Sequence, residues 1–145
     1  MSLSEARFAI VAADFYGELA DRLIAGARAE LSEAGASSID EFRVPGAFEL
    51  PLAADQAVKA GYSGVICVGA VIRGETDHYD WVCAEAARGI MRVGLDTGVP
   101  CGFGVLTVDN MEQAIARSGG DKRDSGRHAA AAVLAQLAIA EKLGG

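Results

Sequence analysis

Short apolar segments alternate with longer segments of helical periodicity along this chain. The strand-like segments lie at residues 7–13, 38–44, 65–72 and 101–108. Apolar residues at helical spacing occupy residues 17–34, 48–60, 79–95, 111–117 and 127–143. Strands that alternate with helices predict a parallel sheet with right-handed crossovers and helices on both faces. We therefore expect a three-layer α/β fold with a four-stranded parallel sheet, in which the more polar strand at 38–44 lies nearer an edge.

The composition is typical of a compact globular protein, since 51% of the 145 residues are hydrophobic and 23% are charged. No repeat, low-complexity tract or linker-like stretch interrupts the pattern, so we expect a single domain over residues 1–145. The formal net charge of −7 argues against nucleic acid and against an anionic membrane surface as partners, because both require a basic face.

The sequence contains no apolar stretch long enough for a membrane span and no apolar core of a signal peptide near its start. Its cysteines, Cys67, Cys83 and Cys101, form an odd set without CxxC spacing. Cys67 and Cys101 fall in apolar strands, where we expect them to be small buried hydrophobes. A reducing cytoplasm is the location that this pattern indicates.

A polar turn follows the most apolar strand and leads into a helix, with the sequence GAVIRGETDHYDWV at residues 69–82. In a parallel sheet, ligands bind at the carboxyl ends of the strands, and the N-terminus of the next helix favours anions. Thr76 offers a hydroxyl group to an oxyanion, and His78 offers an imidazole, the side chain most often used as a base or proton shuttle. The turn therefore predicts chemistry on a phosphorylated small molecule.

The other strand ends should meet this turn at the same edge of the sheet, and each candidate there has two interpretations. Phe15 is placed either to stack on a flat heterocycle or to plug the core. Glu49 either complements a helix dipole or accepts protons from the hydroxyl groups of a sugar-like chain. His78 could equally have a structural role in a first helical turn. The residues alone leave these alternatives open.

Arg117 ends the short helix at 111–117, where most arginines are solvated charges that complement a helix C-terminus. A role in phosphate binding requires that the fold or a neighbouring subunit bring Arg117 to Thr76. Phe103 lies inside the fourth strand and is expected in the core.

Several common phosphate and metal motifs are absent. The sequence has no GxGxxG after the first strand, no GxxxxGK[ST], no HExxH and no paired CxxC. We therefore expect no dinucleotide site, no P-loop and no metal site. Reasoning from single residues ends at a small-molecule α/β protein with an anion site.

Three segments together resemble the lumazine synthases, the 6,7-dimethyl-8-ribityllumazine synthase family of riboflavin biosynthesis. They are VPGAFELP at 44–51, GAVIRGETDH at 69–78, and FGVLT at 103–107 with the nearby Glu112, Gln113, Ala114 and Arg117. Each segment is weak by itself, but the set follows the family's order and spacing along almost the whole chain. The resemblance implies a flavodoxin-like fold and a homopentamer, or a multiple of pentamers, with sites between neighbouring subunits.

The resemblance also implies a reaction. It is the condensation of 5-amino-6-(D-ribitylamino)uracil with 3,4-dihydroxy-2-butanone 4-phosphate, which releases phosphate and water and needs no metal or organic cofactor. Riboflavin synthase is the further partner that the resemblance suggests.

Residue roles follow from the same resemblance. Phe15 looks like the ring that stacks on the pyrimidine. The turn formed by Gly46, Ala47, Phe48 and Glu49 looks like the ribityl contact, in which Glu49 accepts protons from hydroxyl groups.

The strand at 65–72 and the turn after it carry the remaining roles. Val71 and Ile72 look like backbone partners of the uracil, and His78 looks like the proton-transfer residue. The turn formed by Gly74, Glu75 and Thr76 looks like the family's phosphate-binding turn. Two further residues, Phe103 and Arg117, look like those that a neighbouring subunit contributes to the site.

The chain departs from the family pattern after Arg117. Many members have Asn or Asp followed by Lys and Gly, whereas this chain has Asp-Ser-Gly at 124–126. A lysine contact to the substrate is therefore missing at Ser125, and either Lys122 or Arg123 replaces it or activity is reduced. Tyr16, where some members carry Asn or Trp, is a milder change. The short amino-terminal extension favours a free pentamer over an icosahedral shell.

Two other functions stay open. A catalytically impaired paralogue would bind ribityllumazine or riboflavin as a carrier or sensor, which the change at Ser125 allows. A flavodoxin-like electron carrier would purify as a yellow protein with bound FMN, whereas a synthase needs no flavin.

Overall fold

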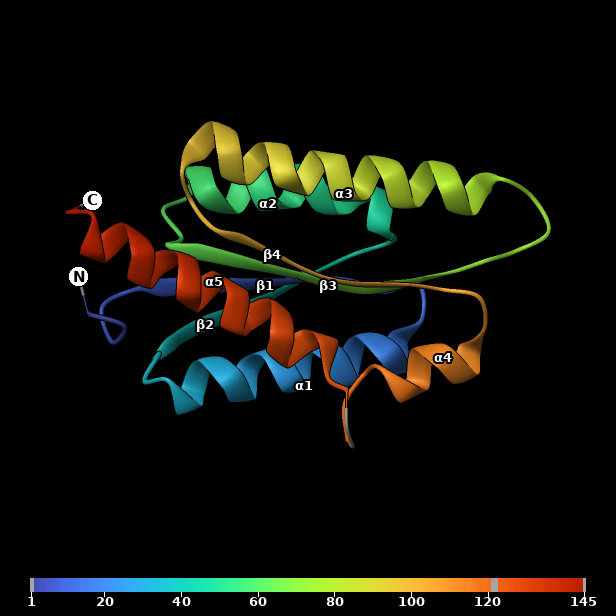
Figure 1. Cartoon of the computed structure of the whole chain (residues 1–145), viewed down its shortest axis with the longest axis horizontal. Coiled ribbons are helices and arrows are strands. Elements are labelled where there is room, and N and C mark those ends of the chain that lie inside the picture. The colour runs from blue at the N-terminus through green and yellow to red at the C-terminus, as the bar shows by residue number, and fades with distance from the viewer. Residues whose placement is uncertain (1, 121–122, 145) are drawn as a thin grey trace.

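The computed structural model describes residues 2–120 and 123–144. Within these residues, four parallel strands form a sheet in the order β2-β1-β3-β4. The strands are β1 (Arg7–Ala13), β2 (Ser38–Val44), β3 (Gly64–Ile72) and β4 (Cys101–Val108). Two helices cover each face, α2 and α3 on one and α1 and α5 on the other (Figure 1). The expected three-layer α/β fold is confirmed.

The helices lie close to their predicted positions. They are α1 (Gly17–Glu33), α2 (Leu50–Lys59), α3 (His78–Thr97), α4 (Met111–Ala116) and α5 (Ser125–Lys142). The second helix was expected from residue 48, but a 3-10 turn at Ala47–Glu49 precedes it. Glu49 Oε1 accepts the backbone N–H of Gly46 at 2.9 Å, which closes this turn before Pro51 enters the α-helix.

The sheet divides the core into two apolar clusters. Ile10 and Ile66 face α1 and α5, whereas Val11 and Val65 face α2 and α3, and all four side chains are buried. Residues of β1 and β3 are buried on both faces because helices cover both, as in most parallel sheets. The strand β2 is largely exposed and forms an edge, as expected.

Glycines in β4 allow α5 to approach the sheet closely. A Cβ atom at Gly102 would lie 2.6 Å from the carbonyl oxygen of Ala129, and one at Gly104 would lie 3.1 Å from Ala129 Cβ. The first distance is too short for any side chain at Gly102, whereas the second would require the neighbour to shift by a few tenths of an ångström. The Ala-rich face of α5 is therefore matched to a glycine-containing edge strand.

Two burial expectations need correction. Phe103 was expected in the core, but its side chain is 43% exposed because β4 is an edge strand and the groove between α3 and α5 leaves this position uncovered. Cys101 is half-buried rather than buried, and its partial desolvation raises the pKa of the thiol to about 11. Cys67 is fully buried as expected, and burial raises the pKa of its thiol further.

None of the helices in residues 2–120 and 123–144 combines the length and the hydropathy that crossing a membrane requires.

Candidate active site

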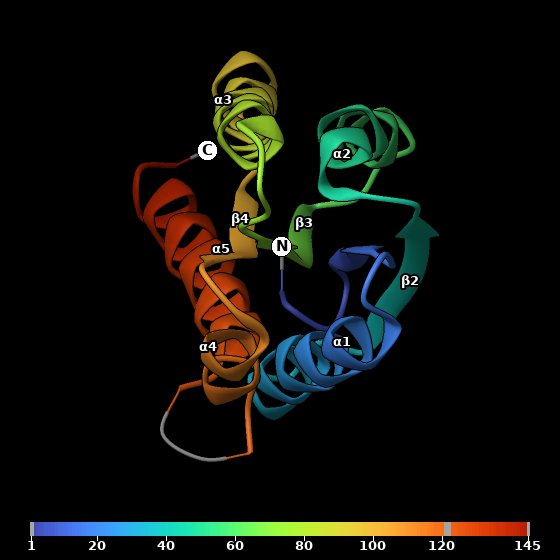
Figure 2. The same cartoon turned by 90° about the vertical axis from the view of Figure 1, so that its right-hand side faces the viewer.

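A pocket of about 610 Å³ lies at the carboxyl ends of β1, β2 and β3. Figure 2 looks at these strand ends, with α3 and α2 above the sheet and α1 below it. The pocket is lined by Phe15, Tyr16, Gly46, Ala47, Phe48, Glu49, Ala70, Val71, Ile72, His78, Trp81 and Val82. The structure therefore brings together, within one chain, the residues that the sequence assigned to the pyrimidine, the ribityl chain and proton transfer.

The end of β1 presents an aromatic ring to this pocket. Phe15 is 74% exposed, so the interpretation that it plugs the core is wrong. Its ring meets Tyr16 edge-on, with centroids 4.9 Å apart. Arg43 pairs with Asp14 at 2.8 Å and with Asp21 at 2.6 Å, which ties the segment before Phe15 to β2 and α1. The ring is thus free to stack on a ligand while its backbone is held.

The turn after β2 supplies the polar side of the pocket. Glu49 is exposed, and one of its carboxylate oxygens caps the turn at Gly46. Glu49 also lines the pocket. The two interpretations of Glu49 are therefore compatible, because a carboxylate has room for several hydrogen-bond donors.

The end of β3 is fastened to the end of β4 through Arg73. Its backbone N–H donates to the carbonyl oxygen of Val108 at 2.9 Å, and its Nε lies 3.0 Å from Asp109 Oδ1. Its guanidinium also lies over the ring of Tyr79, 4.2 Å from the centroid. These contacts hold the first residue of the turn that leads to α3, the connection that projects beyond the strand ends in Figure 1.

The turn at residues 74–76 borders the pocket without lining it. Gly74, Glu75 and Thr76 are all exposed. Thr76 Oγ1 accepts the backbone N–H of His78 at 3.3 Å, so the hydroxyl group lies at the N-terminus of α3. A hydroxyl group at a helix N-terminus is well placed for an anion, since free N–H groups and the helix dipole act there together.

His78 is the first residue of α3, and its side chain is exposed in the pocket. Trp81, which sequence reasoning missed, is 65% exposed and lines the same pocket. Its position could have been found, because residues three apart share one face of a helix. The other missed lining residues, Tyr16, Ala70 and Val82, adjoin predicted residues in the sequence or follow His78 by one helical turn.

Arg117 does not reach this pocket within one chain. It follows α4, where its Nη1 donates to the carbonyl oxygen of Gln113 at 3.0 Å. It lines a separate pocket of about 630 Å³ with Arg22 and Arg123, among other residues. In Figure 2, α4 lies beside α1 and α5, on the opposite side of the sheet from α3. Within one subunit, Arg117 therefore behaves as a charge at a helix C-terminus.

Phe103 is also separate from the strand-end pocket. It lines an apolar groove between α3 and α5 with Met91, Leu95 and Leu137, among other residues. Neither Phe103 nor Arg117 can therefore act in the Phe15–His78 pocket of the same chain.

The departure at Ser125 falls at the start of α5. Asp124 is the N-cap, and its Oδ1 accepts the backbone N–H of Arg127 at 3.0 Å. Ser125 donates its backbone N–H to the carbonyl oxygen of Arg117 at 3.0 Å. Of the two candidates to replace the missing lysine, Arg123 lines the Arg117 pocket, and Lys122 lies outside the described residues.

No cluster of His, Cys, Asp and Glu suited to a metal ion occurs among the residues that the structure describes.

Fold and pocket together define a class: parallel α/β proteins that hold a small molecule at the carboxyl ends of their strands, beside a helix N-terminus. The chain belongs to the 6,7-dimethyl-8-ribityllumazine synthase family, whose model matches residues 5–141. The family is one of enzymes, and the resemblance seen in the sequence is confirmed.

Relatives with that name match most of the chain. One from Kineococcus radiotolerans is 50% identical over 130 residues, which are 88% of this chain and 81% of the relative. One from Desulfatibacillum aliphaticivorans is 45% identical over 145 residues, 98% of this chain and 94% of the relative. One from Nitratidesulfovibrio vulgaris (Miyazaki F) is 46% identical over 140 residues, with coverage of 94% and 90%.

Proposed function

We propose that the protein condenses 5-amino-6-(D-ribitylamino)uracil with 3,4-dihydroxy-2-butanone 4-phosphate to form 6,7-dimethyl-8-ribityllumazine, with release of phosphate and water. The observation that carries the proposal is the strand-end pocket, in which Phe15, Glu49 and His78 meet in a member of this family. The names of the relatives favour an active synthase over an impaired binding protein or an electron carrier.

The proposed residue roles define one orientation for the pyrimidine substrate in the pocket. Its ring stacks on the exposed face of Phe15, and its polar edge meets the backbone of Val71 and Ile72, where β3 extends beyond its pairing with β1. The ribityl chain then runs along the turn at 46–49, and Glu49 accepts protons from its hydroxyl groups. Binding both ends of the substrate fixes the position of its reactive amine.

The phosphate of the second substrate lies at the turn before α3. Thr76 provides a hydroxyl group, whereas Gly74 and Glu75 act through their backbone, because the Glu75 carboxylate itself would repel phosphate. This position sets the four-carbon chain next to the amine, and proximity supplies much of the acceleration.

His78 moves protons during imine formation, phosphate elimination and ring closure. It lies in the pocket at the first position of α3, between the proposed ring site and the phosphate turn. From here its imidazole can exchange protons with the amine, the carbonyl oxygen and the carbon that loses a proton. General acid–base catalysis of this kind contributes about 10²–10⁴-fold to rate.

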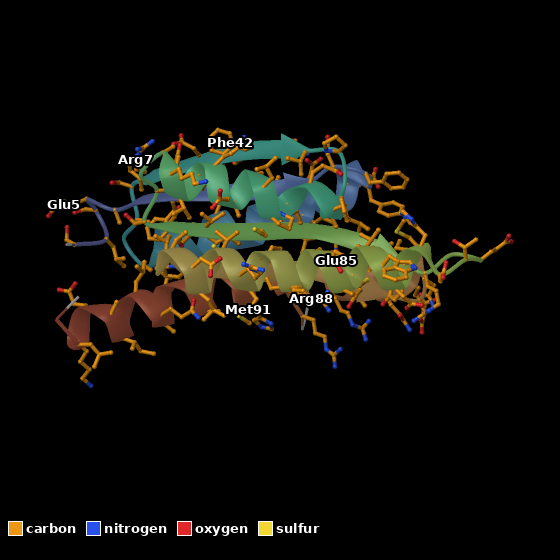
Figure 3. All side chains as sticks on the ribbon, turned by 90° about the horizontal axis from the view of Figure 1, so that it is seen from above. Glu5, Arg7, Phe42, Glu85, Arg88 and Met91 are labelled. Atoms are coloured by element: carbon orange, nitrogen blue, oxygen red, sulfur yellow. The ribbon has the colours of Figure 1, made fainter. Side chains whose placement is uncertain are left out.

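The active protein is a homo-oligomer, a pentamer or a multiple of pentamers, in which a neighbour completes each site with Phe103 and Arg117. The separation of both residues from the strand-end pocket supports this. An uncovered apolar surface supports it too, because Met91 is 63% exposed and Leu95 is 75% exposed. Figure 3 shows Met91 and Arg88 on the outer side of α3, at the opposite margin from Phe42.

The change at Ser125 is compensated by Arg123. Arg123 lines the same pocket as Arg117, and Gly119 donates its backbone N–H to the carbonyl oxygen of Arg123 at 2.9 Å. Two guanidinium groups then face the phosphate in place of one arginine and one lysine.

The wider setting follows from the same function. We propose that the reaction takes place in the cytoplasm and is carried out by a single domain over residues 1–145. Riboflavin synthase is a candidate partner, because it would consume the lumazine.

The test is incubation of the purified protein with both substrates while lumazine absorbance and fluorescence are followed. Product formation at a rate well above that of the uncatalysed mixture is expected. Binding of ribityllumazine without turnover would support the impaired paralogue instead. Light scattering on the same sample measures the assembly, and a monomer would contradict sites shared between subunits.

A further inference from the structure

Arg22 on α1 holds the segment that surrounds Arg117. Its Nε donates to Ser118 Oγ at 2.7 Å, and its Nη2 donates to the carbonyl oxygens of Ile115 at 3.1 Å and Gly119 at 2.7 Å. These acceptors lie on both sides of Arg117 in the sequence. A single planar guanidinium therefore binds the last turn of α4 and the residues after it.

Ser118 is the buried hydrogen-bond partner of Arg22. It is 1% exposed, and it is the one polar side chain that is buried among residues 2–120 and 123–144. Its hydroxyl group accepts from Arg22 and donates to the carbonyl oxygen of Ile115 at 3.1 Å. A hydrogen bond from a charged donor to a buried acceptor is among the stronger polar contacts in a protein.

Arg117 needs such support because its own helix is short. The helix α4 spans only Met111–Ala116, which is too few residues to be stable without tertiary contacts. The Arg117 side chain donates to Gln113 in that helix, and its carbonyl oxygen accepts from Ser125. The direction of the Arg117 guanidinium therefore depends on how firmly the end of α4 is held.

We propose that Arg22 is a positioning residue, which aims the Arg117 guanidinium at the phosphate of the substrate bound by a neighbouring subunit. This inference rests on the proposed function. It assigns Arg22 no contact with the reacting atoms. Instead, it makes affinity for the phosphate-bearing substrate depend on a residue of α1.

A second arginine of α1, Arg28, provides a matched control that distinguishes positioning of Arg117 from a purely structural role of Arg22. Arg28 donates from Nε to Glu41 at 2.8 Å and from Nη2 to the carbonyl oxygen of Ile39 at 3.3 Å. It ties α1 to β2 and does not contact residues 115–119. Removing Arg28 therefore removes comparable hydrogen bonds from α1 and leaves Arg117 in place.

The experiment compares Arg22→Ala, Arg22→Lys and Arg28→Ala in the full assembly by steady-state kinetics. For Arg22→Ala we expect KM for the butanone phosphate to rise about tenfold, with kcat and KM for the pyrimidine close to wild type. The inhibition constant of inorganic phosphate should rise in parallel. Arg22→Lys should recover part of the loss, because one ammonium group cannot span all three acceptors.

The inference is overturned if Arg22→Ala raises KM for the butanone phosphate no more than it raises KM for the pyrimidine. It is also overturned if Arg28→Ala raises KM for the butanone phosphate as much as Arg22→Ala does. If Arg22→Ala does not fold, Ser118→Ala decides, since it deletes one acceptor and should raise KM for the butanone phosphate about threefold. An unchanged KM in that variant also overturns the inference. If the wild type is active and one of these results is obtained, only the positioning role of Arg22 is disproved. If the wild type is inactive, the proposed function is disproved as well.

Discussion

The strand-end pocket and the Arg117 pocket differ in what one chain provides. The first combines an exposed ring, a carboxylate and a histidine at the N-terminus of a long helix. The second concentrates positive charge, with Arg22, Arg117 and Arg123 around one cavity in a protein of net charge −7. The first pocket suits a flat polar ring, and the second suits an anion. This difference in character agrees with the proposal that each pocket binds a different part of the two substrates.

The layers of the fold explain this separation. The chain leaves β3 toward α3 on one side of the sheet and leaves β4 toward α4 on the other (Figure 2). The residues that line the strand-end pocket and those that line the Arg117 pocket are therefore different. This separation is the reason for our proposal that a neighbouring subunit completes each site.

Substitution of His78, the histidine of the strand-end pocket, should have the largest effect on activity. We expect His78→Ala to lower kcat by about a hundredfold or more, because proton transfer is lost while the fold is kept. The side chain is exposed, so thermal unfolding and assembly size should match the wild type. The matched control is His128→Ala, an exposed histidine on α5, which should leave kcat unchanged. A His78→Ala protein that fails to fold would support a structural role for His78.

Removing the Arg117 guanidinium from the second pocket should weaken the use of one substrate only. For Arg117→Ala we expect kcat/KM for the butanone phosphate to fall roughly thirtyfold, the loss of a charged hydrogen bond to phosphate. KM for the pyrimidine substrate should change little. Equal losses for both substrates would remove Arg117 from phosphate binding.

Mixing the two variants tests whether the half-sites come from different chains. His78→Ala and Arg117→Ala proteins, unfolded and refolded together in equal amounts, should form sites with both residues intact. Random assembly gives about a quarter of wild-type activity, since each residue must come from the correct parent. The same variants refolded separately are the control. Activity of the mixture that stays at their average would place both residues in one chain.

The smallest expected effect is on the stacking ring. We expect Phe15→Leu to raise KM for the pyrimidine about fivefold, because an aliphatic side chain keeps apolar area and loses the ring face. Phe15→Tyr, which keeps the ring, should stay near wild type. Since Phe15 is largely exposed, neither change should alter stability. No difference between the two variants would show that stacking does not contribute.

Local patterns predicted the strand-end pocket well. Apolar strands and helical spacing placed every element within a few residues, and the parallel order brought Phe15, Glu49 and His78 to one edge. Trp81 was missed although its spacing from His78 was readable. Phe103 was wrongly assigned to the core, because strand periodicity does not reveal which strand lies at the edge and what covers it.

The sequence by itself determined the parallel sheet, its covering helices and the residues at its strand ends, because these depend on periodicity and on chain direction. Only the tertiary structure decided that α4, which Arg117 follows, lies on the far side of the sheet and that Arg22 hydrogen-bonds to Ser118, 96 positions away. Contacts of this kind depend on how distant segments pack side by side. No spacing within a single segment records them.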